Sequence, residues 1–301
     1  VQAQIKPSTA ADRLNGLQKR KLLEKDTALN SIKFRNVGPS IMSGRVVDVD
    51  VNPSDPTEFF VAYASGGLWY SANNGQSLVP VFDKENAFSM GDIAVNWKDG
   101  IVWVGTGEVN SSRSSYSGFG VYKSTDKGKT WEHLGLPESH HIGKINLHPT
   151  NNNIAWVAVL GHLYSPNKER GIYKTADGGK TWKQTLSVDE NTGAVDMEIN
   201  PKNPDELYAA MWYRTRRAWN FEEGGKTSGI YKSTDGGNTW GATGLNWTTS
   251  QMRTVRRILI NPTNPLIMLA ATSVGIYRST DGGLTWLLSI SGGWRDMEFK
   301  P

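Results

Sequence analysis

An eight-residue motif, Ser/Thr-x-Asp-x-Gly-x-Thr-Trp, recurs along the chain and constrains its fold more than any other feature. Complete copies begin at Ser124, Thr175, Ser233 and Ser279, and a weaker copy begins at Ser71. Successive copies lie 46 to 58 residues apart, a spacing typical of one small antiparallel sheet with its turns. The repetition predicts an all-β propeller of four-stranded blades, with one motif in each blade.

The residue types of the motif suit a tight turn. The carboxylate accepts hydrogen bonds from turn amides, the glycine supplies a positive φ, and the tryptophan packs between neighbouring sheets. Four carboxylates repeated in this way also suggest a catalytic set, but each copy braces its own blade, which favours a structural role. We expect that role for Asp126, Trp131, Asp177, Trp182, Asp235, Trp240, Asp281 and Trp286.

The motif resembles the Asp box of the BNR-repeat proteins, which include sialidases, xyloglucanases and sortilin-type receptors. The likeness extends over residues 34–301 and is greatest to bacterial secreted sortilin-type propellers that are often labelled glycosyl hydrolases. Five segments carry this likeness. They are Gly-Pro-Ser at residues 38–40, Gly-Arg-Val at 44–46, Gly-Gly-Leu-Trp at 66–69, Gly-Thr-Gly-Glu at 105–108 and Gly-Phe-Gly-Val-Tyr-Lys-Ser at 118–124. The resemblance implies a secreted, cell-surface or periplasmic location in a bacterium.

A second marker, a proline turn, sets the order of strands within a blade. Asn-Pro turns begin at Asn52, Asn200 and Asn261, and a His-Pro turn begins at His148. Alternating strands flank each turn, so the order is strand, Pro turn, strand, loop, strand, Asp box, strand. In such a meander the Pro turns and the Asp boxes share one face, and the loops between the second and third strands lie on the other.

The sequence contains five recognisable blades, and the segments at both ends of the repeat region indicate additional strands. Residues 294–301 read as the first strand of a sixth blade, and residues 32–37 as an outer strand that closes the ring. We therefore expect the propeller of residues 34–301 to be part of a larger one. Residues 1–33 form a separate arm, for which Ser8 to Asp12 predict a helix start. Leu14, Leu17 and Leu22 would pack that helix on the propeller; a flexible basic leader is the alternative.

Loop lengths predict where the function lies. From the proline turn to the Asp box, the second, third and fourth blades are 8 to 14 residues longer than the first and fifth. Most of the excess falls between the second and third strands, and variable loops on a rigid scaffold usually carry function. The candidate binding residues on this face are Arg45, Glu108, Arg113, Tyr116, His141, His162, Arg216, Trp219 and Arg253, with Arg295 nearby.

These residue types suit a sugar or a peptide, because aromatic rings stack and guanidinium groups grip anions. A glycoside hydrolase needs two carboxylates, and Glu108 with Asp92 or Glu222 is the best available pair. A sialidase needs an arginine cluster, which Arg45, Arg253 and Arg295 would form. Residues 34–37, Phe-Arg-Asn-Val, depart from the Phe-Arg-Ile-Pro opening of sialidases and make that activity a poor fit. Catalytic residues of xyloglucanases are not transferable, since that likeness is limited to the boxes.

Composition excludes several other classes. The net charge of +4 resides in residues 1–33, so the body is neutral and nucleic acid is not the expected partner. With no cysteine there is no disulfide or thiolate site. His140 and His141 are adjacent and point to opposite sides of a strand, so we expect no metal site, and no motif indicates a cofactor. No apolar run is long enough for a membrane helix, and Val1 to Gln4 resemble the end of a cleaved signal peptide.

The sequence therefore predicts an exported propeller that binds or scaffolds a glycan or a protein on its loop face, next to further domains of the same polypeptide. Hydrolysis of an extracellular polysaccharide on the same face is the alternative.

Overall fold

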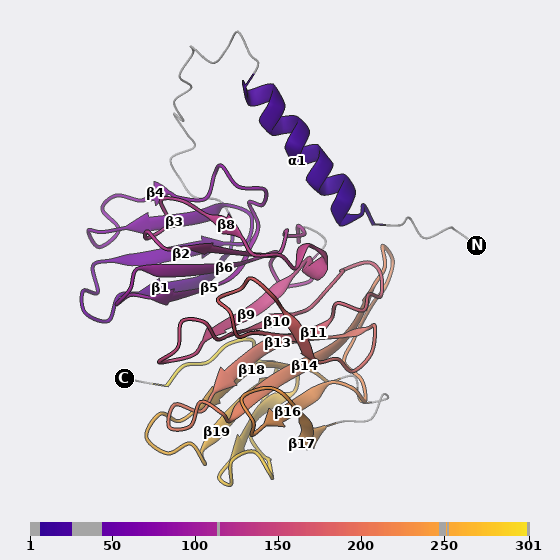
Figure 1. Cartoon of the computed structure of the whole chain (residues 1–301). Coiled ribbons are helices and arrows are strands. Elements are labelled where there is room, and N and C mark those ends of the chain that lie inside the picture. Colours follow the sequence, from indigo (N-terminus) through magenta and orange to yellow (C-terminus); the bar gives the residue numbers. More distant parts are fainter. Residues whose placement is uncertain (1–6, 26–43, 113–114, 247–250, 252, 300–301) are drawn as a thin grey trace.

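The fold is built from five antiparallel sheets arranged in chain order (Figure 1). The computed structural model describes residues 7–25, 44–112, 115–246, 251 and 253–299. Blade one contains β1 (Val46–Val51), β2 (Phe59–Tyr63), β3 (Gly67–Ser71) and β4 (Val79–Pro80). Blade two contains β5 (Met90–Asn96), β6 (Ile101–Thr106), β7 (Val121–Ser124) and β8 (Glu132–His133). Blade three contains β9 (Ile142–Leu147), β10 (Ala155–Val159), β11 (Gly171–Thr175) and β12 (Lys183–Leu186).

Blade four differs from the others by an added hairpin. It contains β13 (Thr192–Ile199), β14 (Leu207–Arg216), β16 (Gly229–Ser233) and β17 (Gly241–Asn246), and the short strand β15 (Phe221–Glu223) pairs with the end of β14. Blade five contains β18 (Val255–Ile260), β19 (Met268–Thr272), β20 (Gly275–Ser279) and β21 (Leu287–Ser291). Every Asp box lies between the third and fourth strands, so the predicted propeller fold and its strand order are confirmed.

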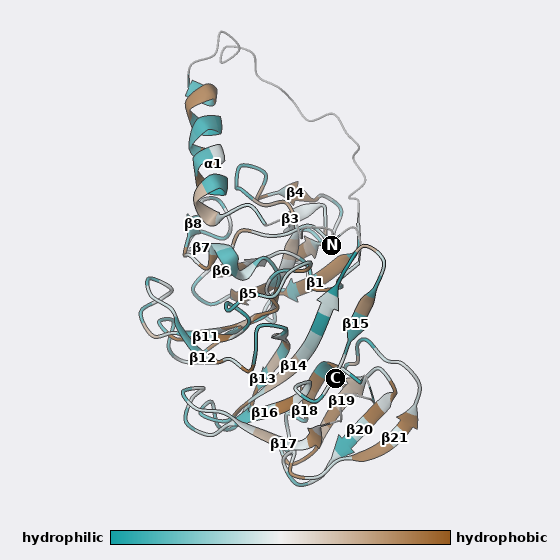
Figure 2. Ribbon diagram, turned by 90° about the vertical axis from the view of Figure 1, so that its right-hand side faces the viewer, coloured by the Kyte–Doolittle hydropathy of each residue, from teal (hydrophilic) through white to brown (hydrophobic). Residues whose placement is uncertain are grey.

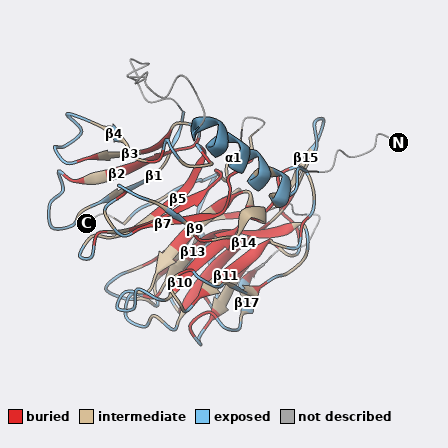
Figure 3. Ribbon diagram, turned by 45° about the horizontal axis from the view of Figure 1, so that its top comes forward, coloured by how far each residue is buried: buried red, intermediate tan, exposed pale blue. Residues whose placement is uncertain are grey.

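Apolar side chains fill the space between neighbouring blades. The described residues form four buried clusters, one for each neighbouring pair of blades, and the largest members of these clusters are Tyr122, Trp103, Trp156 and Trp212. Figure 3 shows the buried residues concentrated in the strands at the middle of the fold. Alternation along the strands places these side chains on the faces that neighbouring blades share.

Each complete Asp box forms the same hydrogen-bond network. In the second blade, Asp126 Oδ1 accepts from the Thr130 amide at 2.9 Å and Oδ2 accepts from the Thr130 hydroxyl at 2.6 Å. Ser124 Oγ accepts from the amide of Gly128, which has a φ of 80° that favours glycine. The network ties the turn to the strand before it.

The box tryptophans connect neighbouring blades. Trp131 Nε1 donates to the carbonyl of Val81 after β4, and Trp182 Nε1 donates to the carbonyl of Leu134 after β8, both at 2.7 Å. Trp240 Nε1 reaches Thr185 Oγ1 on β12 at 3.3 Å. Trp286 departs from this pattern, since it bonds to Gly283 of its own turn.

The box carboxylates predict a specific acid sensitivity. Hydrogen bonds from the box threonine lower the pKa of Asp126, Asp177 and Asp281 to about 2, and that of Asp235 is lowered too. A carboxyl whose pKa is depressed on folding stabilises the protein above its unfolded pKa, near 4, and loses that effect as the pH falls towards 2. We expect the melting temperature to fall across this window, and Asp177→Asn to make the fall shallower. Parallel pH profiles for the variant and the unchanged protein would contradict the bracing role of the box.

The first strands of the blades are joined by a second repeated contact. One carboxylate oxygen of Asp48, Asp92 and Asp196 accepts from the amide of Ile93, Ile145 and Ile258 respectively, at 3.1, 2.7 and 2.7 Å. Each of these bonds links a blade to the next one along the chain. Figure 1 shows these strands succeeding one another through the middle of the fold.

The N-terminal arm contains the helix α1 (Ala10–Lys25). Thr9 caps it, because its Oγ1 accepts from the Asp12 amide at 3.1 Å. The expected leucine face does not bury: Leu14 and Leu22 are exposed, and Leu17 is only half-buried. The helix instead docks through polar contacts, with Arg13 donating to the carbonyls of Gly118 and Pro137. Figure 2 shows that most of its surface is hydrophilic.

Residues 294–299 follow the fifth blade without forming a strand. They nevertheless run beside β18, because Arg257 pairs with Asp296 at 3.5 Å and with Glu298 at 3.2 Å. This is the position that the first strand of a sixth blade would occupy. The predicted closing strand at residues 32–37 lies outside the described residues.

Candidate functional site

The added residues of blades two, three and four lie between the second and third strands, where the sequence places them. We call residues 107–112, 115–120, 160–170 and 217–228 the insertion layer. In blades one and five only three and two residues separate the same strands. The insertion layer therefore occupies the face opposite the Asp boxes.

Two buried arginines lock the insertion layer together. Arg214, at the end of β14, donates to Ser111 Oγ in blade two and to the carbonyl of Gly161 in blade three at 3.0 Å. Arg170 donates to the carbonyl of His162 at 2.7 Å and to that of Arg214 at 3.3 Å. Burial lowers the pKa of both, that of Arg170 to about 10. These contacts join loops from three blades into one layer.

Glu108 is the best-connected acid of this face. Its side chain is 1% exposed and pairs with Arg45 at the start of blade one. Its carboxylate also accepts from the Ser115 hydroxyl and from the Asn110 amide, each at 2.7 Å. The buried His141 contacts the Glu108 carbonyl through Nδ1 at 2.8 Å, and burial holds the pKa of this imidazole well below its usual range.

The other two candidate acids have partners of their own. Asp92 is buried and bonds Lys144 at 3.2 Å as well as the next blade's strand; burial raises its pKa. Glu222 on β15 accepts from Thr215 and Asn220, both at 3.1 Å, within its own hairpin. Neither shares a hydrogen-bond partner with Glu108 among the contacts of the described residues, and the repeat of the Asp92 contact in two other blades indicates a structural role.

Exposed aromatic side chains are spread over this face. Tyr116 in the insertion layer lies against Phe88, which precedes β5, with ring centroids 5.2 Å apart. Trp219, at the tip of the blade-four hairpin, is 73% exposed. Arg216 lies over the ring of Phe221 at 4.6 Å in the same hairpin. Exposed large aromatics of this face include Phe88, Tyr116, Tyr164 and Trp219.

The remaining candidate binding residues make contacts of different kinds. Arg253 approaches Tyr277 Oη of its own blade at 3.5 Å, and Arg295 reaches Asn110 Oδ1 in blade two at 3.3 Å. Arg113 lies outside the described residues. His162 is buried in the blade-three insertion, where it contacts Glu138 rather than a surface ligand.

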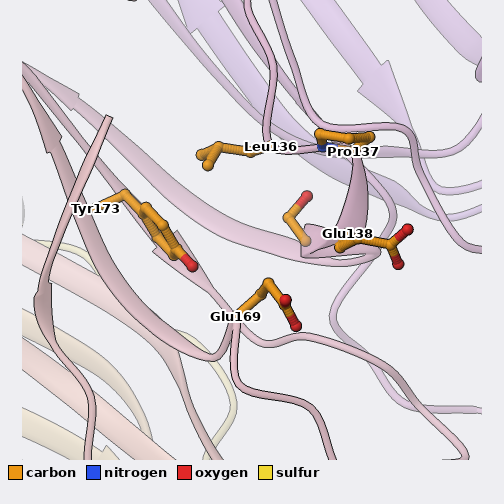
Figure 4. Close-up of a pocket in the computed structure, with 6 residues that line it drawn as sticks. Leu136, Pro137, Glu138, Glu169 and Tyr173 are labelled. Atoms are coloured by element: carbon orange, nitrogen blue, oxygen red, sulfur yellow. The ribbon is translucent and has the colours of Figure 1, made fainter. Parts of the chain in front are cut away.

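A pocket of about 240 Å³ opens beside this histidine. Leu136, Pro137 and Glu138 from the connection between blades two and three line it together with Glu169 and Tyr173 of blade three (Figure 4). Sequence reasoning missed Glu138 and His140, because it compared His140 only with its neighbour in the chain. Histidines 22 residues apart carry no spacing signal, and only the fold brings them together.

Comparisons with known proteins agree with this architecture. Residues 120–267 match the Sortilin-Vps10 family model, described as sortilin, neurotensin receptor 3. No curated protein sequence is similar enough to count as a match.

Three solved structures share the fold. An ancestral GH74 enzyme superposes with a TM-score of 0.61 at 19% identity, over 82% of this chain and 31% of that one. The GH74 enzyme of Niastella koreensis gives 0.57 at 20%, over 82% and 38%. The GH74 xyloglucanase of Xanthomonas campestris gives 0.50 at 16%, over 83% and 46%. The chain thus spans less than half of each enzyme. It is a β-propeller that is similar to sortilin over residues 120–267. Among its described residues, no helix has the length and apolar character of a membrane span.

Proposed function

We propose that this sortilin-like propeller is an exported binding or scaffolding module that holds a glycan or a protein segment on its insertion layer. The observation that carries the proposal is the combination of a locked loop layer with exposed aromatic rings. Arg170 and Arg214 fix the loops from below, and rings such as Tyr116 and Trp219 remain accessible above them. Rigid aromatics at fixed positions give contact area with little loss of conformational entropy.

The acids of this face support binding better than hydrolysis. A retaining glycosidase needs two carboxylates about 5–5.5 Å apart, and an inverting one about 6.5–9.5 Å apart, both facing the sugar. Glu108 is almost fully buried and has three donors, while Asp92 and Glu222 have partners elsewhere. With these contacts, the Glu108 carboxylate holds the insertion layer and the Arg45 side chain in place.

Glycoside hydrolysis is the alternative, because the solved structures with the same fold include GH74 enzymes, one of them a xyloglucanase. Their likeness extends to the fold, so the activity has to be tested on this chain. In that case Glu108 would act as one of the two carboxylates.

Arrays of glycans and of peptides, screened for both binding and hydrolysis, test the proposal. For any ligand found, Trp219→Ala and Tyr116→Ala should weaken binding by about tenfold or more, as expected when an aromatic anchor is removed. Leu266→Ala provides the control, since this exposed residue lies in the Pro turn of blade five on the opposite face.

Two outcomes would overturn the assignment. Unchanged affinity in both aromatic variants would place the ligand elsewhere. Loss of hydrolysis in Glu108→Gln with binding retained would establish the enzyme in place of the binding module.

A further inference from the structure

Glu138 and His140, from the connection between blades two and three, and His162, from the blade-three part of the insertion layer, form a group of potential metal ligands. Their ligand atoms all lie within 4.8 Å of one another. Glu138 Oε2 is 3.2 Å from His162 Nε2 and 3.5 Å from His140 Nε2. Ligands about 2.0–2.1 Å from a tetrahedral ion stand roughly 3.3 Å apart, so both separations suit one ion.

The two oxygens of Glu138 have separate environments. Oε1 accepts from the Ala10 amide at 2.5 Å and lies 3.6 Å from Arg13, both at the start of α1. Oε2 faces the two imidazoles. The first oxygen thus fixes the carboxylate in place, and the second is directed at the histidines in the manner of a supported metal ligand.

His162 is held by contacts that leave its Nε2 directed at the group. Its Nδ1 contacts Ser165 Oγ at 2.9 Å, its amide donates to Asn167 Oδ1 at 2.9 Å, and its carbonyl accepts from Arg170. A hydrogen bond from Nδ1–H to Ser165 leaves a lone pair on Nε2, as a metal-binding imidazole requires.

Two independent features of His140, its side-chain nitrogen and its backbone conformation, indicate a metal-binding site. Its Nε2 is buried and makes no hydrogen bond, although it faces the carboxylate. Its backbone has a φ of 53° with a ψ of −45°, which lies outside the regions that non-glycine residues ordinarily adopt, and Leu136 nearby is left-handed with a φ of 55°. Strained backbone of this kind gathers at functional sites, and here it turns His140 towards His162, with ring centroids 3.8 Å apart.

We propose that Glu138, His140 and His162 bind one zinc ion, with a fourth position left to water. Two imidazoles and one carboxylate are the ligand set that zinc uses in sites with an open position. They disfavour calcium and magnesium, which prefer oxygen ligands alone.

Charged groups of both signs surround the three proposed ligands. Three nearby arginines, Arg13, Arg170 and Arg214, disfavour a further positive charge. Their effect is offset by the negative charges of Glu138 and Glu169, which line the same pocket. A bound ion would connect α1, the blade two to three connection and the blade-three insertion.

Zinc titration of tag-free, chelator-treated protein tests the proposal. We expect one equivalent to bind and the melting temperature to rise, because the ion binds the folded state. His162→Ala, Glu138→Gln and His140→Asn should each weaken zinc binding by at least about 10–100-fold, the loss typical of removing an outer partner alone. Asparagine is chosen at position 140 because it tolerates a positive φ.

His148→Ala is the matched control, since this histidine lies in a Pro turn on the opposite face, and it should leave zinc affinity unchanged. Zinc should also slow hydrogen exchange in residues 160–170 of the otherwise unaltered protein, a readout that does not depend on any variant folding. No binding to the unaltered protein, or equal affinity in His162→Ala and His148→Ala, would overturn the site.

Discussion

Replacing Trp182 by alanine should lower the free energy of unfolding by about 2–3 kcal/mol, somewhat less than the loss of a fully buried aromatic, because this ring is partly buried. This ring belongs to an Asp box of blade three but packs edge-on against Trp103 of blade two, with centroids 6.2 Å apart. Its Nε1 also donates to the Leu134 carbonyl. The variant therefore removes contacts between blades, and chemical denaturation with a fluorescence or circular dichroism readout measures the loss.

Trp219→Ala is the control for this experiment, because the same side chain is lost from an exposed hairpin tip. Its unfolding free energy should stay within about 0.5 kcal/mol of the parent value. Equal losses in the two variants would mean that the box tryptophan does not join the blades.

Replacing Arg214 by methionine should cost about 3 kcal/mol or more, because it leaves the Gly161 carbonyl and the Ser111 hydroxyl buried without their donor. Methionine fills much of the same volume, so the effect reports on hydrogen bonding rather than on a cavity. The insertion layer should also loosen, and ligand affinity should fall although Arg214 is too buried to touch a ligand. Thermal denaturation together with hydrogen exchange in residues 107–112 measures both effects.

Arg217→Ala is the matched control for this second variant, since Arg217 is an exposed arginine three residues further along the chain. It should leave stability and exchange unchanged. If Arg214→Met unfolds no more readily than Arg217→Ala, the insertion layer is held by something other than this guanidinium.

The sequence predicted most of the fold because its signals are local. An Asp box such as the one at Ser124 specifies its own turn through an acceptor, a glycine and a threonine within eight residues. Proline turns of the Asn52 type specify theirs in the same way: the side chain accepts from the amide two residues on, at 3.0 Å. The lengths of the insertions followed from counting between these markers.

The site was less predictable because its contacts are long-range. Arg214 is not among the residues that the sequence singles out, because it is buried by contacts with residues more than 50 positions away. His162 was expected to face a ligand and instead faces Glu138, since the blade two to three connection folds over it. The leucines of α1 did not predict how the helix docks, because the helix is held by polar contacts of Arg13 in its first turn.

Hydrogen exchange with and without a bound ligand tests the central claim most directly. A glycan or peptide ligand should protect residues 107–112, 115–120, 160–170 and 217–228 and leave hydrogen exchange in the Asp-box turns unchanged. Protection confined to the Asp-box face, with the insertion layer exchanging as before, would contradict it.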